Sequence, residues 1–187
     1  SIFKIYEKIA SIYVKGKLLK KLLSELTLFR KQTYEALESI DRRFHGNVRA
    51  KVLTNGGELP TSVLMEYIMN ANGLDSCHVP KEHWPIVTDD NFENAMPIYE
   101  LSKKEISYLI ESLERGKIVS LAGFLGVTAD GLETTLGRGG SDLTAVFVSC
   151  LLKSQYNVET LLFKDMPIQS ADPKIVKGQK TFDIASL

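Results

Sequence analysis

Residues able to bind a small anion gather between Gly137 and Asp142, where the chain reads Gly-Arg-Gly-Gly-Ser-Asp. Arg138 supplies a permanent positive charge in a planar fork that suits a carboxylate or phosphate. Ser141 or Asp142 is a natural N-cap for a following helix, since apolar residues recur at helical spacing after them. Glycines allow a sharp turn and close approach of a ligand, and the free N–H groups of a helix start attract anions. The segment therefore predicts a binding site for a small acidic ligand.

A tight turn that only caps a surface helix is the alternative interpretation of this segment. It would explain the glycines, the serine and the aspartate without any ligand. It would not explain why Thr134, Thr135 and Arg138 fall within the same few residues. We therefore favour the binding site.

The wider segment from Gly123 to Ala145 reads GFLGVTADGLETTLGRGGSDLTA, after the apolar run Ile118–Ala122. It resembles the signature of aspartate kinases, which belong to the amino-acid kinase superfamily. The match is long, nearly contiguous and unusual in residue order, so it is more specific than a lone glycine-rich loop. The apolar run predicts a buried strand, the segment a polar loop, and the residues after it a helix. The resemblance implies an α/β fold, the three-layer αβα amino-acid kinase fold with a mainly parallel sheet, incomplete at both ends.

The resemblance also implies roles for individual residues. Arg138 would clamp a carboxylate of L-aspartate, with the hydroxyl and backbone amide of Ser141 nearby. Asp142 would hold the loop and orient the groups around the phosphates, so Arg138 and Asp142 are the predicted catalytic residues. Glu58 would bind the substrate ammonium, because Gly57-Glu58 matches the Gly-Glu-Arg-Leu-Ser segment of the family. Glu58 could instead be a first-turn acid favoured by a helix dipole.

A nucleotide-binding segment is implied near the end of the chain. Val158–Phe163 predicts a strand, and Ser170–Val176 resembles the Thr-Ala-Asp-Pro-Arg segment of aspartate kinases. Asp165 would take the place of the acidic residue that lies at the nucleotide. Lys164 replaces a small hydroxyl residue and Lys174 replaces the usual arginine, so both are predicted nucleotide contacts with altered geometry. An exposed polar loop would explain these two lysines equally well.

A second resemblance lies between Thr88 and Ala95, which reads Thr-Asp-Asp-Asn-Phe-Glu-Asn-Ala. Aspartate kinases carry a very similar run with glycine where this chain has Glu93. The carboxylates and amides could also suggest a cation site, but their spacing is wrong for calcium. We expect a loop at the wall of the substrate pocket.

Hydrophobic periodicity predicts the surrounding elements. The first forty residues predict two amphipathic helices interrupted at Gly16. Arg49–Leu53 predicts a strand and Thr54–Gly57 a turn, followed by a helix that ends at Asn72-Gly73. Leu101–Leu113 predicts a single helix capped by Ser102.

The composition limits the class of protein. The 187 residues include 23 Lys or Arg and 23 Asp or Glu, so nothing favours nucleic acid as a partner. Cys77 and Cys150 are interpreted as free thiols in a reducing compartment, with a disulfide as the weaker alternative. His78 and His83 have poor metal-ligand spacing, so no metal site is predicted. The sequence shows no membrane span or signal peptide, and we expect a cytoplasmic protein.

The function implied by the resemblance is aspartate kinase activity. ATP would phosphorylate the side-chain carboxylate of L-aspartate to 4-phospho-L-aspartate, the first step of lysine, threonine and methionine biosynthesis. Mg²⁺ would be held mainly by ATP oxygens, and exposed apolar helix faces favour a homodimer. Residues 1–116 would form a helical and substrate-lobe part, and residues 117–187 the start of a nucleotide-binding lobe.

Two family segments have no counterpart in these 187 residues: the N-terminal Lys-Phe-Gly-Gly-Thr-Ser loop and the C-terminal ACT domains. We therefore expect a partial catalytic domain. An alternative is a non-catalytic fragment or subunit that keeps the aspartate pocket and acts in binding or assembly. Another amino-acid kinase, acting on glutamate, carbamate or UMP, is a third interpretation.

Overall fold

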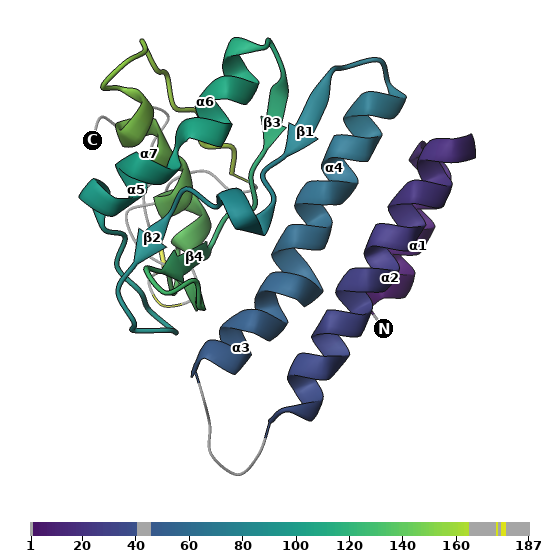
Figure 1. The fold of residues 1–187 in the computed structure, drawn as a ribbon, viewed down its shortest axis with the longest axis horizontal. Coiled ribbons are helices and arrows are strands. Elements are labelled where there is room, and N and C mark those ends of the chain that lie inside the picture. Colours follow the sequence, from purple (N-terminus) through teal and green to yellow (C-terminus); the bar gives the residue numbers. More distant parts are fainter. Residues whose placement is uncertain (1, 41–45, 165–174, 176, 179–187) are drawn as a thin grey trace.

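The computed structural model describes residues 2–40, 46–164, 175, 177 and 178. A helical layer forms one side of the molecule (Figure 1). It consists of α1 (Ile2–Tyr13), α2 (Gly16–Glu38) and α4 (Leu59–Ala71), which pack against one another. Their shared core is apolar and includes Leu22, Leu26 and Val63, all essentially inaccessible to water. The predicted pair of N-terminal amphipathic helices is confirmed.

The strands lie between this helical layer and three further helices, α5 (Tyr99–Glu105), α6 (Ser107–Glu114) and α7 (Gly140–Leu152) (Figure 1). In one sheet, β1 (Ser76–His78) pairs in parallel with β3 (Ile118–Ser120). In the other, β2 (Val87–Thr88) pairs in parallel with β4 (Leu125–Thr128), and β4 pairs antiparallel with β5 (Glu133–Thr135). The arrangement is mixed α/β with parallel pairing, as predicted. A second core with Trp84, Ile86 and Leu151 joins strands and helices.

The segment predicted as a strand and turn is helical instead. α3 (Gly46–Leu53) continues through a π-helical turn, η1 (Thr54–Glu58), directly into α4. Contacts from outside the segment hold this turn: the Tyr6 hydroxyl donates to the carbonyls of Gly56 and Gly57 at 3.3 and 3.1 Å. Within it, the Asn55 amide donates to Lys51 O at 2.9 Å. Tertiary contacts therefore override the turn preference of Asn-Gly-Gly.

Three other predictions of secondary structure were wrong. The predicted helix Leu101–Leu113 is broken at Ile106 into α5 and α6. Ser102 is no cap, since its buried Oγ accepts the N–H of Val87 at 2.9 Å. The segment Gly123–Ala145 is not one loop, because it contains the β4–β5 hairpin. Val158–Phe163 forms no strand and pairs with no strand of the described residues.

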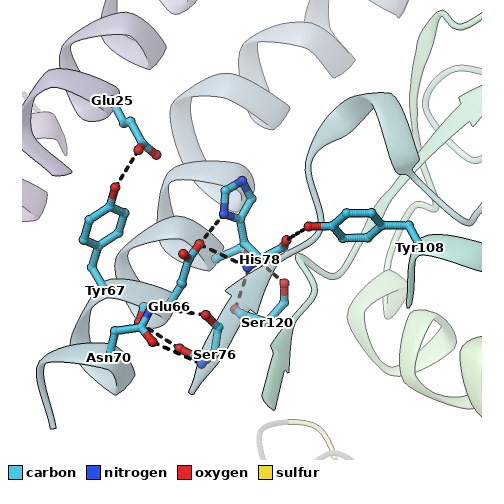
Figure 2. A network of polar contacts seen from close by, with 9 residues as sticks. Glu25, Glu66, Tyr67, Asn70, Ser76, His78, Tyr108 and Ser120 are labelled. Atoms are coloured by element: carbon cyan, nitrogen blue, oxygen red, sulfur yellow. Dashed lines mark hydrogen bonds and ion pairs between the residues drawn. The ribbon is translucent and has the colours of Figure 1, made fainter. Parts of the chain in front are cut away.

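Polar contacts fasten helix α4 to strand β1 (Figure 2). The Glu66 carboxylate pairs with the His78 ring and also accepts the His78 N–H at 3.1 Å. The Asn70 side chain accepts the N–H of Ser76 at 3.0 Å and donates to its carbonyl at 3.2 Å. Tyr108 donates to the His78 carbonyl at 3.4 Å from the other side. This network joins α4 to β1 and, through Tyr108, β1 to α6.

Among the described residues, every helix is too short or too polar to cross a membrane. A short 3₁₀ helix, η2 (Lys81–His83), precedes β2. An isolated antiparallel bridge joins Thr88 to Pro97.

Candidate functional site

Three distant segments of the chain meet around a cavity of about 430 Å³. The loop from Gly137 to Asp142, at the start of α7, forms one side, Glu58 comes from the end of η1, and Lys164 follows α7. The structure therefore brings together Glu58, Arg138, Ser141, Asp142 and Lys164, all of which the sequence singled out. Asp165 and Lys174 lie outside the described residues.

The backbone of the glycine loop depends on left-handed conformations. Gly137 and Gly139 have φ of +71° and +79°, which residues with a side chain rarely adopt. Gly139, not Ser141 or Asp142, is the N-cap of α7, so the predicted cap was placed too late. A Cβ at Gly140 would lie 2.9 Å from the Leu136 Cβ, so glycine is required here for close packing. As a result Ser141 and Asp142 stand in the first turn of the helix.

Two N–H groups at this helix start are available for a ligand. Gly140 N–H donates to Gly137 O at 3.1 Å, and Leu143 N–H donates to Gly139 O at 3.1 Å. For the N–H groups of Ser141 and Asp142, the described part of the chain offers no acceptor. The positive end of the 13-residue α7 adds to them. An anionic group in the cavity would satisfy these donors.

Phe124, a residue with a strained backbone, supports the glycine loop through hydrogen bonds. Phe124 has a φ of +73°, the one positive φ outside glycine among the described residues. Its N–H donates to Thr144 Oγ1 at 3.0 Å, and its carbonyl accepts the N–H of Leu136 at 2.9 Å. Thr144 Oγ1 in turn donates to Gly140 O at 2.9 Å. The buried Thr144 hydroxyl thus ties the floor of the cavity to the first turn of α7.

Glu58 is half-buried and lines the same cavity. Burial raises the pKa of this carboxyl above its usual value, because its charged form loses solvation. A cationic group in the cavity would offset that loss and restore the ionised form. Glu58 therefore suits an ammonium group, while the glycine loop suits a carboxylate.

Asp142 and Lys164 form an ion pair, with Nζ 2.5 Å from each carboxylate oxygen. Their side chains remain 47% and 45% exposed, so the pair adds little to stability and can exchange partners with a ligand. Arg138 is exposed and has no ion-pair partner within the described part of the chain. Among the described residues, the cavity thus holds one guanidinium without an ion-pair partner and one ammonium in an exposed ion pair.

The loop from Thr88 to Ala95 does not line this cavity. Thr135 N–H and Oγ1 both donate to Phe92 O, at 2.9 and 3.2 Å, which fixes the loop along β5. Asn94 lies against the backbone of Gly137 on its far side. The predicted pocket wall is therefore a support behind the glycine loop.

Two other hollows, of about 560 and 570 Å³, are larger than the candidate site. Both are lined by Lys81 and Glu82, and the first also by Glu133, which pairs with Lys81. Neither is lined by a helix start with free N–H groups, and we therefore place the candidate site at the smaller cavity. In the described residues, no cluster of three His, Cys, Asp or Glu is arranged to hold a metal ion.

Sequence reasoning missed Phe124 and Thr144, and it expected Asn94 in a pocket wall instead of against the backbone of Gly137. Nothing in the sequence marks Phe124 as left-handed, since phenylalanine rarely adopts that conformation. Thr144 could have been found, because it follows Gly140 by four residues and a threonine there can reach back to that carbonyl. Sequence reasoning also placed Lys164 with the nucleotide, without expecting its pairing with Asp142.

Comparison with known proteins shows which proteins this chain is similar to. Aspartokinase 2 of Bacillus subtilis is 34% identical over 128 residues, which is 68% of this chain and 30% of that protein. The aspartokinase of Chlamydia muridarum is 35% identical over 136 residues, 72% of this chain and 30% of that protein. The aspartokinase of Thermus thermophilus matches 98% of this chain at 29% identity, and 44% of its own length is covered. The chain thus spans less than half the length of these relatives.

Among solved structures, Escherichia coli aspartokinase III in complex with aspartate and ADP matches with a TM-score of 0.74. The identity is 20%, and the match covers 98% of this chain and 44% of that one. At this identity the likeness shows the fold alone. The sequence model of the amino acid kinase family matches residues 14–187. Because this match covers most of the sequence, the chain belongs to the amino acid kinase family.

Proposed function

We propose that this chain carries the aspartate-binding part of an aspartate kinase, which transfers the γ-phosphoryl group of ATP to the side-chain carboxylate of L-aspartate. The product is 4-phospho-L-aspartate, the first intermediate toward lysine, threonine and methionine. The observation that carries the proposal is the shared cavity of Glu58, Arg138 and the first turn of α7. An acidic residue and an anion-binding turn face one ligand, as a zwitterion with an additional carboxylate requires.

In this proposal Glu58 binds the ammonium of aspartate, and Arg138 grips a carboxylate in bidentate fashion. The Ser141 N–H and hydroxyl complete the carboxylate site. The relatives named above support the substrate, because they are aspartokinases and the solved neighbour was captured with aspartate and ADP. Residues 1–116 would form the substrate lobe and residues 117–187 the start of the nucleotide lobe.

Transfer in this site depends on position and charge. An oxygen of the substrate carboxylate attacks the γ-phosphorus, and the bond from that phosphorus to the β–γ bridging oxygen breaks. ADP leaves with the electron pair, and no proton needs to move because the attacking carboxylate is already ionised. Holding the two reactants in line supplies much of the acceleration. Asp142 would orient the groups around the transferring phosphoryl.

Lys164 is suited to neutralise phosphate charge at the boundary between the two substrates. Its ammonium reaches the cavity, and among the described residues it pairs with the exposed carboxylate of Asp142. When phosphate oxygens arrive, Lys164 can exchange Asp142 for them. Asp165 and Lys174 are proposed as further nucleotide contacts on motif position alone.

ATP brings Mg²⁺ as its phosphate complex, and the ion would neutralise charge on the phosphates. The described residues that line the cavity include two carboxylates, of which Glu58 is assigned to the ammonium. Asp142, once released from Lys164, is the one that fits a contact with the ion. An Mg²⁺ ion that is held mainly by the phosphate oxygens of ATP needs few ligands from the protein. The Asp142 carboxylate therefore fits a Mg–ATP substrate.

The test is binding and turnover with the purified chain. Calorimetry with L-aspartate should show binding that Arg138→Ala abolishes and that Arg115→Ala, an exposed arginine at the end of α6, leaves intact. Trapping the acyl phosphate with hydroxylamine in the presence of Mg–ATP would report transfer. Unchanged aspartate affinity in Arg138→Ala would overturn the assignment of the site.

A second candidate is a binding or assembly module that retains the aspartate pocket without transferring phosphate. The described residues of the cavity offer Glu58 and the first turn of α7, which suit the binding of aspartate whether or not phosphate is then transferred. Binding of aspartate without hydroxamate formation would support this module, and turnover above background would exclude it.

A further inference from the structure

The segment from Asp89 to Met96 connects the two sides of the candidate site without lining it. We propose that it is a brace that fixes Arg138 relative to Glu58, with Asn94, Glu93 and Arg49 as its positioning residues. The proposal rests on the proposed function, since it takes Glu58 and Arg138 as the two ends that grip aspartate.

The segment is rigid by its own hydrogen bonds. The Asp89 Oδ1 atom accepts the N–H groups of Asn91 and Met96 at 3.2 and 3.1 Å, which closes the segment on itself. Asn94 N–H donates to Asn91 O at 3.0 Å. The carboxylate of Asp89 is therefore engaged with the backbone, and it shapes the segment rather than binding a cation.

One end of the brace supports the glycine loop. Ala95 N–H donates to Thr135 O at 2.9 Å, which places Asn94 at the end of β5. A Cβ at Gly137 would collide with Oδ1 of Asn94 and lie 3.0 Å from its Cγ. The Asn94 amide is thus in close contact with the backbone that turns into Arg138. Moving this side chain would let the loop relax away from the cavity.

The other end is fastened to the helix that carries Glu58. Arg49 on α3 lies with Nη1 2.5 Å from Oε1 of Glu93. A Cβ at Gly46, the first residue of α3, would lie 2.9 Å from the Phe92 Cβ, so the backbone of α3 also approaches the brace closely. α3 continues without interruption through η1 to Glu58.

The ion pair is suited to positioning more than to stability. The Arg49 and Glu93 side chains are 57% and 45% exposed, and exposed pairs contribute little to folding free energy. Residues in direct contact nevertheless couple measurably when both are changed. Reversing these two charges, singly and together, can therefore change the geometry of the site while the chain stays folded.

The experiment compares Arg49→Glu, Glu93→Arg and the double swap with the unchanged chain. Each single reversal should raise the Kd for L-aspartate in calorimetry about fivefold, and the double swap should return it to within about twofold. Glu111→Arg is the control of equal charge change, because it breaks the more exposed Glu111–Arg115 pair at the end of α6 and should leave the Kd unchanged. Asn94→Ala should weaken binding in the same direction as the single reversals.

A second readout needs no ligand. Amide hydrogen exchange in peptides spanning 136–143 should quicken in both single reversals and in Asn94→Ala, and should recover in the double swap. Unchanged exchange and unchanged Kd in folded single variants would overturn the brace, as would a double swap that recovers neither. If the unchanged chain does not bind aspartate, the proposed function fails, and the exchange pattern alone still decides for or against the brace.

Discussion

The hydroxyl of Thr144 accepts the backbone N–H of Phe124 at 3.0 Å and donates to the carbonyl of Gly140 at 2.9 Å. This relationship explains how a phenylalanine is kept at a φ of +73° beneath the anion-binding turn. Strain of this kind persists only where surrounding contacts determine the conformation, and it is often found at binding sites. The backbone shape of the cavity therefore depends on one buried hydroxyl.

Thr144→Val should remove this hydroxyl at almost constant volume. The Phe124 N–H then loses its acceptor, and we expect the free energy of unfolding to fall by about 1–3 kcal/mol. The affinity for L-aspartate should fall with it, because the turn is released. Denaturant titration and calorimetry are the measurements. Thr144→Ser keeps the hydroxyl and should behave nearly as the unchanged chain; a Ser variant as weak as the Val variant would contradict this role.

Glu58→Gln should separate stability from binding. Burial raises the pKa of Glu58, so the folded state favours the protonated form and ionisation at neutral pH opposes folding. The neutral amide should therefore unfold at slightly higher denaturant near pH 7, and this difference should vanish at low pH where Glu58 is protonated. Aspartate affinity should drop roughly tenfold or more, since a charge-assisted contact is lost.

The same pKa shift predicts a pH dependence of ligand binding in the unchanged chain. Only ionised Glu58 pairs with an ammonium, so aspartate affinity should decline as pH falls through the raised pKa of this carboxyl. The decline should begin at a higher pH than for an ordinary glutamate. Calorimetry across the acid range is the measurement, and Glu58→Gln should lose this part of the pH dependence. An identical profile in both proteins would show that Glu58 does not face the ligand.

The turn at the candidate site could be predicted because its glycines are adjacent in the sequence. Gly137–Asp142 predicts a turn and an anion site; the structure confirms the turn and places Arg138 and Asp142 on one cavity, while the anion site stays a prediction. The prediction for Thr54–Gly57 failed because the structure of this segment depends on a residue far away in the sequence. Thr54–Gly57 is helical because Tyr6, about fifty residues away, donates to its carbonyls. The hairpin inside Gly123–Ala145, by contrast, has a local signal that was overlooked, because its turn contains Asp130-Gly131, a dipeptide typical of hairpins, with Gly131 at a φ of +78°.

Asn70→Ala tests whether the polar network between α4 and β1 is structural and separate from the site (Figure 2). The substitution removes two hydrogen bonds to Ser76, at 3.0 and 3.2 Å, in a half-buried setting. The free energy of unfolding should fall by about 1–3 kcal/mol. Aspartate affinity of the folded fraction should stay within about twofold, because distant independent sites act additively. Asn72→Ala, whose exposed side chain only donates to Ile68 O, is the control.

Lys164→Met should act on the nucleotide step and spare the binding of aspartate. The substitution keeps an unbranched side chain of similar length and removes the charge that pairs with Asp142. Since that pair is exposed, stability should change by less than about 1 kcal/mol. In an assay with turnover, the KM for Mg–ATP should rise or kcat fall about tenfold or more, because phosphate charge is no longer neutralised. Lys153→Met, at the C-terminal end of α7, is the control of equal charge change. A Lys164 variant with unchanged ATP kinetics and weaker aspartate binding would assign this lysine to the acidic substrate instead of to phosphate.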